Sequence, residues 1–113
     1  MEFITKNLKE IILSVEDVRA HLEIIIEQAR NEKIKGVKLV HGYGSHGRGG
    51  VVSVELKRLL PELKRKKTIK EYFYGNSWDI SNSDCQRFLA KCPDAASDED
   101  LNKSNPGITI IAI

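Results

Sequence analysis

A short apolar segment at residues 37–40 runs directly into a glycine-rich loop, and a helical pattern follows that loop. Six of the eight glycines of the chain lie between Gly36 and Gly50. Glycine permits positive φ and lets a ligand approach the backbone closely. The sequence therefore predicts a strand–loop–helix unit, with the loop at the carboxyl end of a strand, where α/β sheets bind ligands.

Further strand patterns lie on both sides of this unit. Residues 1–7 predict a short edge strand or a partly ordered lead-in, and residues 8–13 predict a strand buried on both faces. β-Branched and aromatic residues predict another strand at 69–74. The final segment, 108–113, is apolar throughout, and we expect it to be an interior strand.

Helical periodicity separates these strands. The first helix should run from a capping box at Ser14 to about residue 33, and the second from about residues 49–51 through 63. Pro61 should kink the second helix or end its first segment. A third helix should begin at residue 82 or 83 and end near 91. This order predicts one α/β domain over residues 1–113, a two-layer sandwich of about four mainly parallel strands with helices.

Composition limits the classes of function. The net charge is only +2, and no run approaches the roughly 20 apolar residues that cross a bilayer. The N-terminal residues lack the features of a secretory signal, so we expect a cytoplasmic protein that does not enter a membrane. Cys85 and Cys92 lie too far apart on one helix to form a disulfide and are interpreted as reduced thiols. We predict no metal site from them.

The glycine-rich loop fits two common nucleotide motifs poorly. Residues 42–47 match G-x-G-x-x-G, but the acidic residue expected after the next strand is absent, because that strand ends in Tyr74-Gly75-Asn76. The chain is also too short to hold a second half of a dinucleotide fold. A Walker loop requires Gly-Lys-Ser/Thr, and that triplet does not occur.

The loop nevertheless favours an anion such as phosphate. Backbone N–H groups of a glycine-rich turn form an anion-binding nest, and the following helix directs its positive end to the same place. A basic run leaves the second helix and could contact further phosphates. Each feature also has a structural explanation without a ligand. The glycine-rich loop could be a purely structural crossover, and the basic run could be an ordinary solvated helix end. The candidate binding residues are Gly42, Tyr43, Gly44, Ser45, His46, Gly47, Arg48, Gly49 and Gly50, with Lys64, Arg65, Lys66 and Lys67.

The segment VKLVHGYGSHGRGGVVSVELKRLL resembles the core of the Smr (small MutS-related) domain, in which a strand leads into a His/Thr-Gly-x-Gly signature and a helix. His41, Gly42 and Gly44 match that signature. The resemblance implies a compact α/β sandwich, similar to the C-terminal domain of the third bacterial translation initiation factor, that binds DNA or RNA. Some family members also nick nucleic acid.

The first signature of the family does not carry over. Where Leu-Asp-Leu-His-Gly is expected, this chain has Lys9-Glu10-Ile11-Ile12-Leu13. Endonuclease activity in the family is associated with that signature, so the resemblance implies nucleic-acid binding with weak or lost cleavage. The segment from residue 76 to 104 is interpreted as an atypical insertion.

Two further hypotheses remain open. His41, with His46 as a partner, is a candidate general acid or base for phosphodiester hydrolysis, and a divalent cation would be needed only for that activity. Alternatively, the chain is a protein-interaction or phosphate-ligand-binding module on a degenerate Smr scaffold. In that case the acidic segment within 76–104 would be the partner surface, although a solvated loop explains it equally.

Overall fold

The computed structural model describes residues 2–9, 14–42 and 48–113. Along the chain, α-helices and β-strands alternate, and two short 3-10 helices, η1 and η2, flank the third α-helix. The elements are β1 (Phe3–Asn7), α1 (Val15–Asn31), β2 (Gly36–Val40), α2 (Arg48–Arg65), β3 (Glu71–Tyr74), η1 (Gly75–Ser77), α3 (Ser83–Lys91), η2 (Pro93–Ser97) and β4 (Ile108–Ala112).

The four strands form one mixed sheet in the order β1-β2-β4-β3. Strand β1 is parallel to β2, whereas β4 is antiparallel to both of its neighbours. Three of the four strands therefore run in the same direction, which confirms the predicted α/β class with mainly parallel strands. All five residues of β4 are buried, so the prediction of an interior terminal strand is also confirmed.

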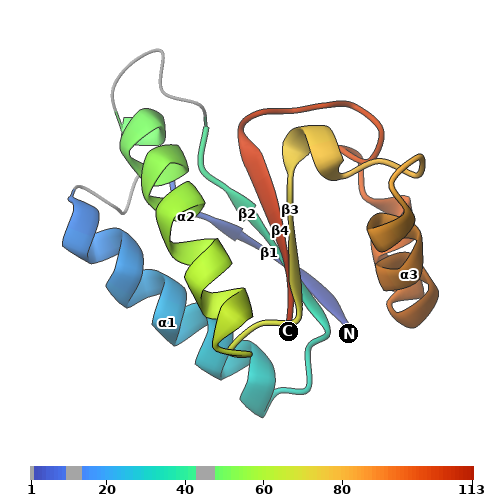
Figure 1. Ribbon diagram of the computed structural model, residues 1–113, viewed down its shortest axis with the longest axis horizontal. Helices are drawn as coiled ribbons and strands as arrows, with labels where there is room; N and C mark the ends of the chain where they lie inside the picture. Colours follow the sequence, from blue (N-terminus) through green and yellow to red (C-terminus); the bar gives the residue numbers. More distant parts are fainter. Residues whose placement is uncertain (1, 10–13, 43–47) are drawn as a thin grey trace.

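Helices α1 and α2 cover one face of the sheet (Figure 1). Ser14 caps α1 by accepting a hydrogen bond from the backbone N–H of Asp17, as the capping box predicted. The apolar stripe of α1 packs on the stripe of α2 and on Val37 and Leu39 of β2. The two helices and the sheet are the two layers of the predicted sandwich. The helix residues buried in the core between them are Val18, Leu22, Ile25, Ile26, Ala29, Val52, Leu56, Leu59 and Leu60.

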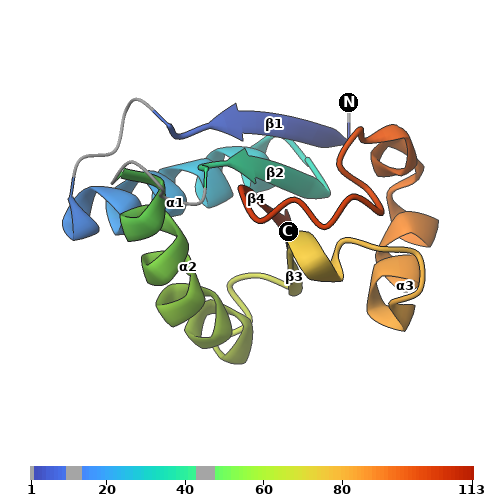
Figure 2. The same ribbon diagram turned by 90° about the horizontal axis from the view of Figure 1, so that it is seen from above.

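The segment from η1 to β4 packs on the opposite face, with α3 lying apart from α1 and α2 (Figure 2). Trp78 and Phe88 are buried there beside Phe73, with ring centroids 5.8–5.9 Å apart. Gly36 belongs to this contact, because a Cβ at that position would lie 2.5 Å from Cζ of Phe88. Cys85 and Cys92 are free and buried in the same cluster.

The predicted edge strand within residues 1–7 is confirmed, because β1 lies at one edge of the sheet. Two other predictions are wrong in part: Leu8 and Lys9 do not belong to a strand, and Pro61 does not end a helical segment. The first strand is Phe3–Asn7, and Leu8 and Lys9 follow it, while residues 10–13 lie outside the described residues. Phe3 and Ile4 pack on opposite faces of the sheet, which gives β1 enough buried surface for an edge strand. Helix α2 runs through Pro61 to Arg65 as one element. Leucines on both sides of Pro61 pack against the core and hold the helix together.

Candidate functional site

The carboxyl ends of β2 and β3 meet the start of β4 at one edge of the sheet, which we name the carboxyl edge. The chain leaves β2 here through His41 and Gly42, whose N–H groups both donate to the carbonyl of Gly107, at 2.9 and 3.0 Å. Gly42 has a φ of 73°, a conformation that glycine adopts without strain. A Cβ at Gly107 would lie 3.2 Å from Cα of Gly42. His41 and Gly42 are therefore held against the turn that precedes β4.

His41 is buried at this edge, with 2% of its surface exposed. Its Nδ1 contacts the carbonyl of Gly42 and its Nε2 lies 2.9 Å from Oγ1 of Thr109. A carbonyl only accepts, so Nδ1 carries the proton and Nε2 accepts from the Thr109 hydroxyl. Burial lowers the pKa of His41, hydrogen bonds to the Gly42 and Ile108 backbone oppose this, and Lys57 lowers it further. His41 is therefore held neutral, with both ring nitrogens occupied.

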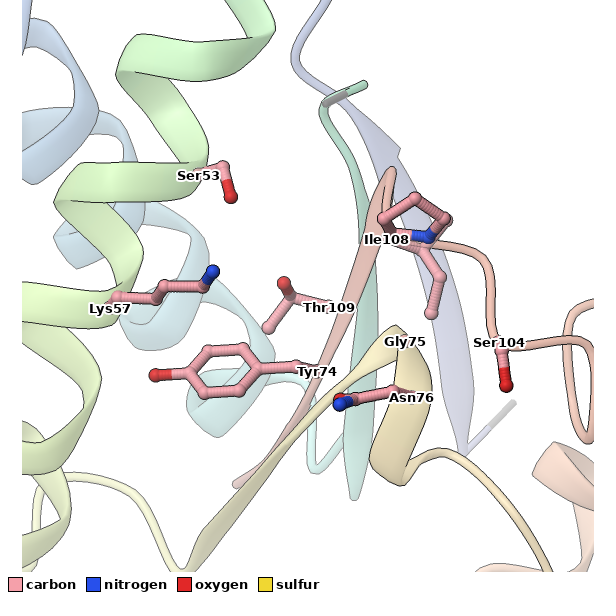
Figure 3. A pocket seen from close by; sticks show the side chains of 9 residues that line it. Ser53, Lys57, Tyr74, Gly75, Asn76, Ser104, Ile108 and Thr109 are labelled. Atoms are coloured by element: carbon pink, nitrogen blue, oxygen red, sulfur yellow. The ribbon is translucent and has the colours of Figure 1, made fainter. Parts of the chain in front are cut away.

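A cavity of about 360 Å³ opens beside Thr109, between α2, β3 and β4 (Figure 3). Helix α2 contributes Ser53 and Lys57, which lie one turn apart. Tyr74 ends β3 on the other side, and the turns before β4 close the far end. The cavity is lined by Ser53, Lys57, Tyr74, Gly75, Asn76, Ser104, Pro106, Ile108 and Thr109.

Lys57 is the charged member of this lining. Its Nζ lies 5.8 Å from the ring centroid of Tyr74, within the range of a cation–π contact. Burial, with a smaller contribution from Tyr72, raises the pKa of Tyr74, so the phenol stays protonated. Hydroxyl and amide groups supply the rest of the polar lining. The cavity combines one cation with neutral hydrogen-bonding groups, an arrangement that suits an anionic ligand.

Comparison with known families gives a match to the Smr domain over residues 11–78, more than half of the chain. The chain belongs to the Smr domain family. The crystal structure of the Smr domain of Thermus thermophilus MutS2 shares its fold, with a TM-score of 0.57 and 15% sequence identity. That alignment covers 96% of this chain and 94% of the MutS2 domain. Among proteins with curated descriptions, none matches this sequence.

The central part of the predicted binding loop of this Smr domain, residues 43–47, lies outside the described residues, and so do its candidates Tyr43, Ser45 and His46. Residues 48–50 form the first turn of α2. The N–H of Gly42 already donates to Gly107. That amide is consequently committed within the protein and is not free for an anion.

The predicted basic run lies at the opposite end of α2 from residues 48–50 in this Smr domain. Lys64 and Arg65 end α2, whereas residues 48–50 begin it, so about 25 Å of helix separates the two groups. Lys64 pairs with Glu71 at 2.9 Å, and Lys66 pairs with Glu62 at 2.9 Å. The structure therefore does not bring residues 48–50 and the basic run into one site.

The cavity of the Smr domain uses residues that the sequence analysis did not select. Ser53 and Lys57 are spaced by one helical turn, beside the apolar stripe of α2, and Tyr74 occupies the end of a strand. This spacing and the strand end are signals that could have identified them. Thr109 and Ser104 carry no comparable signal, because their place at the edge depends on where β4 enters the sheet.

The acidic segment of the Smr domain is turned partly inward. Lys38 of β2 is buried and pairs with Asp98, at 2.8 Å, and with Asp100. Burial by itself would lower the pKa of Lys38, but the hydrogen bonds and charges of Asp100 and Asp98 raise it. The hydrogen bond from Lys38 in turn lowers the pKa of Asp100. The prediction of a solvated loop is thus wrong for these two aspartates, because they neutralise a buried lysine.

In residues 2–9, 14–42 and 48–113, no three His, Cys, Asp or Glu side chains gather as metal ligands would. Nor does any helix within those ranges have the length and apolar character to cross a membrane.

Proposed function

We propose that this Smr domain binds DNA or RNA at the carboxyl edge of its sheet. The observation that carries the proposal is the cavity around Lys57, which lies beside the junction of β2 with the glycine-rich segment. Lysine, serine and threonine side chains, with helix amino ends, are common contacts to nucleic-acid phosphates. The family membership supports the same kind of ligand.

The carboxyl edge offers two sources of positive potential. Lys57 faces the cavity, and the amino end of α2 begins at Arg48. The basic run at the other end of α2 is partly neutralised by Glu62 and Glu71. In this proposal, that run adds long-range attraction, and the carboxyl edge makes the close contacts.

His41 serves this site as a positioning residue. Both of its ring nitrogens are used within the protein, by the Gly42 carbonyl and the Thr109 hydroxyl. A general acid or base needs a ring nitrogen within hydrogen-bond reach of the substrate. The geometry supports a role in which His41 ties the start of the glycine-rich segment to β4 and fixes the Thr109 wall of the cavity.

A polymer-binding assay tests the proposal. Fluorescence anisotropy with single-stranded and double-stranded DNA and RNA should show binding at low salt, and the logarithm of the affinity should fall linearly with the logarithm of salt concentration. Failure of all four polymers to bind at low salt would remove the proposal.

A separate assay addresses cleavage. A supercoiled plasmid and a structured RNA can be incubated with Mg²⁺ and either the natural protein or a His41→Ala variant whose binding has been verified. Equal cleavage, or none, by both proteins agrees with the positioning role. Cleavage that is lost only in the variant would return His41 to a proton-transfer role.

A further inference from the structure

We infer that the cavity beside Lys57 accepts one unpaired nucleotide, so that the domain selects single-stranded segments over duplex. This inference rests on the proposed nucleic-acid binding and assigns a particular ligand to the cavity. The observations behind it are the size of the cavity, the distribution of polar and apolar groups along it, and its position between two elements of the fold.

One end of the cavity suits a phosphate. Figure 3 shows the side chains of Ser53 and Lys57 pointing from α2 into the same space, with Thr109 opposite them. The ammonium of Lys57 supplies charge and three donors, and the Ser53 hydroxyl supplies one more. Thr109 already donates to His41 and forms a fixed wall. A phosphate held by Lys57 and Ser53 would therefore meet a cation and a hydroxyl, and none of the described residues that line the cavity carries a carboxylate.

The other end suits a base. Gly75, Pro106 and Ile108 present apolar surface, and the Asn76 side chain offers both a donor and an acceptor. Gly75 is packed so closely on the turn before β4 that a Cβ there would lie 1.6 Å from the Asn105 carbonyl oxygen. This contact joins η1 to the approach to β4 and gives the cavity a fixed end wall. The amide of Asn76 can then bind the hydrogen-bonding edge of a base.

The volume and position of the cavity explain the selection for unpaired nucleotides. At about 360 Å³ the cavity is near the lower limit of ligand pockets, which run from about 300 to 1,000 Å³, so it suits one nucleotide. It is recessed between α2 and η1. A paired base would have to leave its stack to enter, at a cost of a few kcal/mol. An unpaired base avoids most of this cost.

Nuclear magnetic resonance titration of the ¹⁵N-labelled protein tests the inference. Three probes are added separately: a short unstructured oligonucleotide, a hairpin of the same nucleotides whose two strands are joined by a non-nucleotide linker so that every base is paired, and a nucleoside 5′-monophosphate. The oligonucleotide and the monophosphate should shift the amide signals of Ser53, Lys57, Gly75 and Asn76. The hairpin should bind more weakly and leave these signals in place.

Matched variants measure the role of charge. Lys57→Met keeps the side-chain length but removes the cation, and it should weaken oligonucleotide binding about tenfold, as expected for a charged hydrogen bond. Ser53→Ala should weaken binding less. Lys91→Met removes an exposed cation from α3, near the opposite edge of the sheet, and should change the affinity less than about twofold.

The outcomes separate this inference from the proposed function. Oligonucleotide binding that is insensitive to Lys57→Met and shifts no cavity signal would overturn the inference and leave nucleic-acid binding intact. A hairpin that binds as tightly as the single strand would overturn the selectivity. If no polymer binds, the proposed function fails. If the monophosphate still shifts the amide signals of the cavity residues in that case, the cavity is a site for a small phosphorylated ligand.

Discussion

Two lysines occupy recesses in this Smr domain, and their surroundings differ. Lys38 lies under the segment that follows β3, and its side chain is 4% exposed and paired with Asp98 and Asp100. Lys57 lines an open cavity at the carboxyl edge, above the ring of Tyr74 and among hydroxyl and amide groups. The first lysine is neutralised within the protein, whereas the second faces a space that an anion can enter.

The comparison of Lys38 with Lys57 shows that the presence of a positive charge does not by itself locate a binding site. Four consecutive cations at residues 64–67 attract attention in the sequence, yet two of them pair with glutamates on the surface. Lys57 has more potential to bind a ligand, because it faces a cavity and, among the described residues, no carboxylate pairs with its ammonium. Four substitutions test this contrast.

The largest effect is expected at the buried ion pair. Replacing Asp98 by Ala leaves the charge of Lys38 poorly compensated and removes the acceptor of the Trp78 Nε1–H bond. Breaking such a pair costs about 3 kcal/mol or more in the free energy of unfolding. Urea denaturation measures the loss, and the exposed Glu99→Gln change serves as the control. A loss below about 1 kcal/mol would show that Asp100 alone satisfies Lys38.

Lys57→Met should separate binding from stability. Within the described part of the chain, the favourable contact that is lost is the cation–π contact with Tyr74, which is worth about 0.5–1 kcal/mol. The free energy of unfolding should therefore fall by no more than about 1 kcal/mol, while oligonucleotide affinity falls about tenfold. Urea denaturation and anisotropy on the same preparation measure both quantities. A large stability loss with unchanged affinity would place Lys57 in the same structural class as Lys38.

His41 should make the stability of the carboxyl edge depend on pH. Because burial lowers its pKa in the folded state, the unfolded chain binds the proton more readily. The stabilisation is present above the ordinary pKa of about 6.5 and is lost as pH falls below it, by up to about 1.4 kcal/mol per pH unit. Unfolding curves at several pH values should show this slope, and a His41→Gln variant should lack it. Identical slopes in the two proteins would contradict a buried neutral His41.

The smallest effect is expected at the end of α2. Lys64 pairs with Glu71 on the surface, and its side chain is 47% exposed. Exposed pairs contribute little, so Lys64→Met should lower the free energy of unfolding by about 0.5 kcal/mol. Its effect on oligonucleotide affinity should be smaller than that of Lys57→Met. If Lys64→Met weakened binding more, the basic run and not the cavity would make the close contacts.

Local patterns in the sequence were sufficient to predict most helices and strands of this protein. Apolar spacing predicted α1 and α2, Ser14 predicted where α1 begins, and a cap at residue 82 or 83 predicted α3. The continuous apolar run at residues 108–113 predicted an interior strand. These features follow from periodicity and capping, which act among residues close in the chain. The strand–loop–helix unit that contains the glycine-rich segment was also predicted from residues close in the chain. The same unit carries the resemblance to the Smr family.

Contacts between residues distant in the sequence depend on the folded arrangement of the whole chain. The insertion of β4 between β2 and β3 brings Thr109 to His41 across 68 residues, and it encloses the cavity beside Lys57. Packing of the segment after β3 on the other face brings Asp98 to Lys38 across 60 residues. Neither contact is visible in local periodicity, because strand order and side-chain pairing are set by how the whole chain buries its apolar faces.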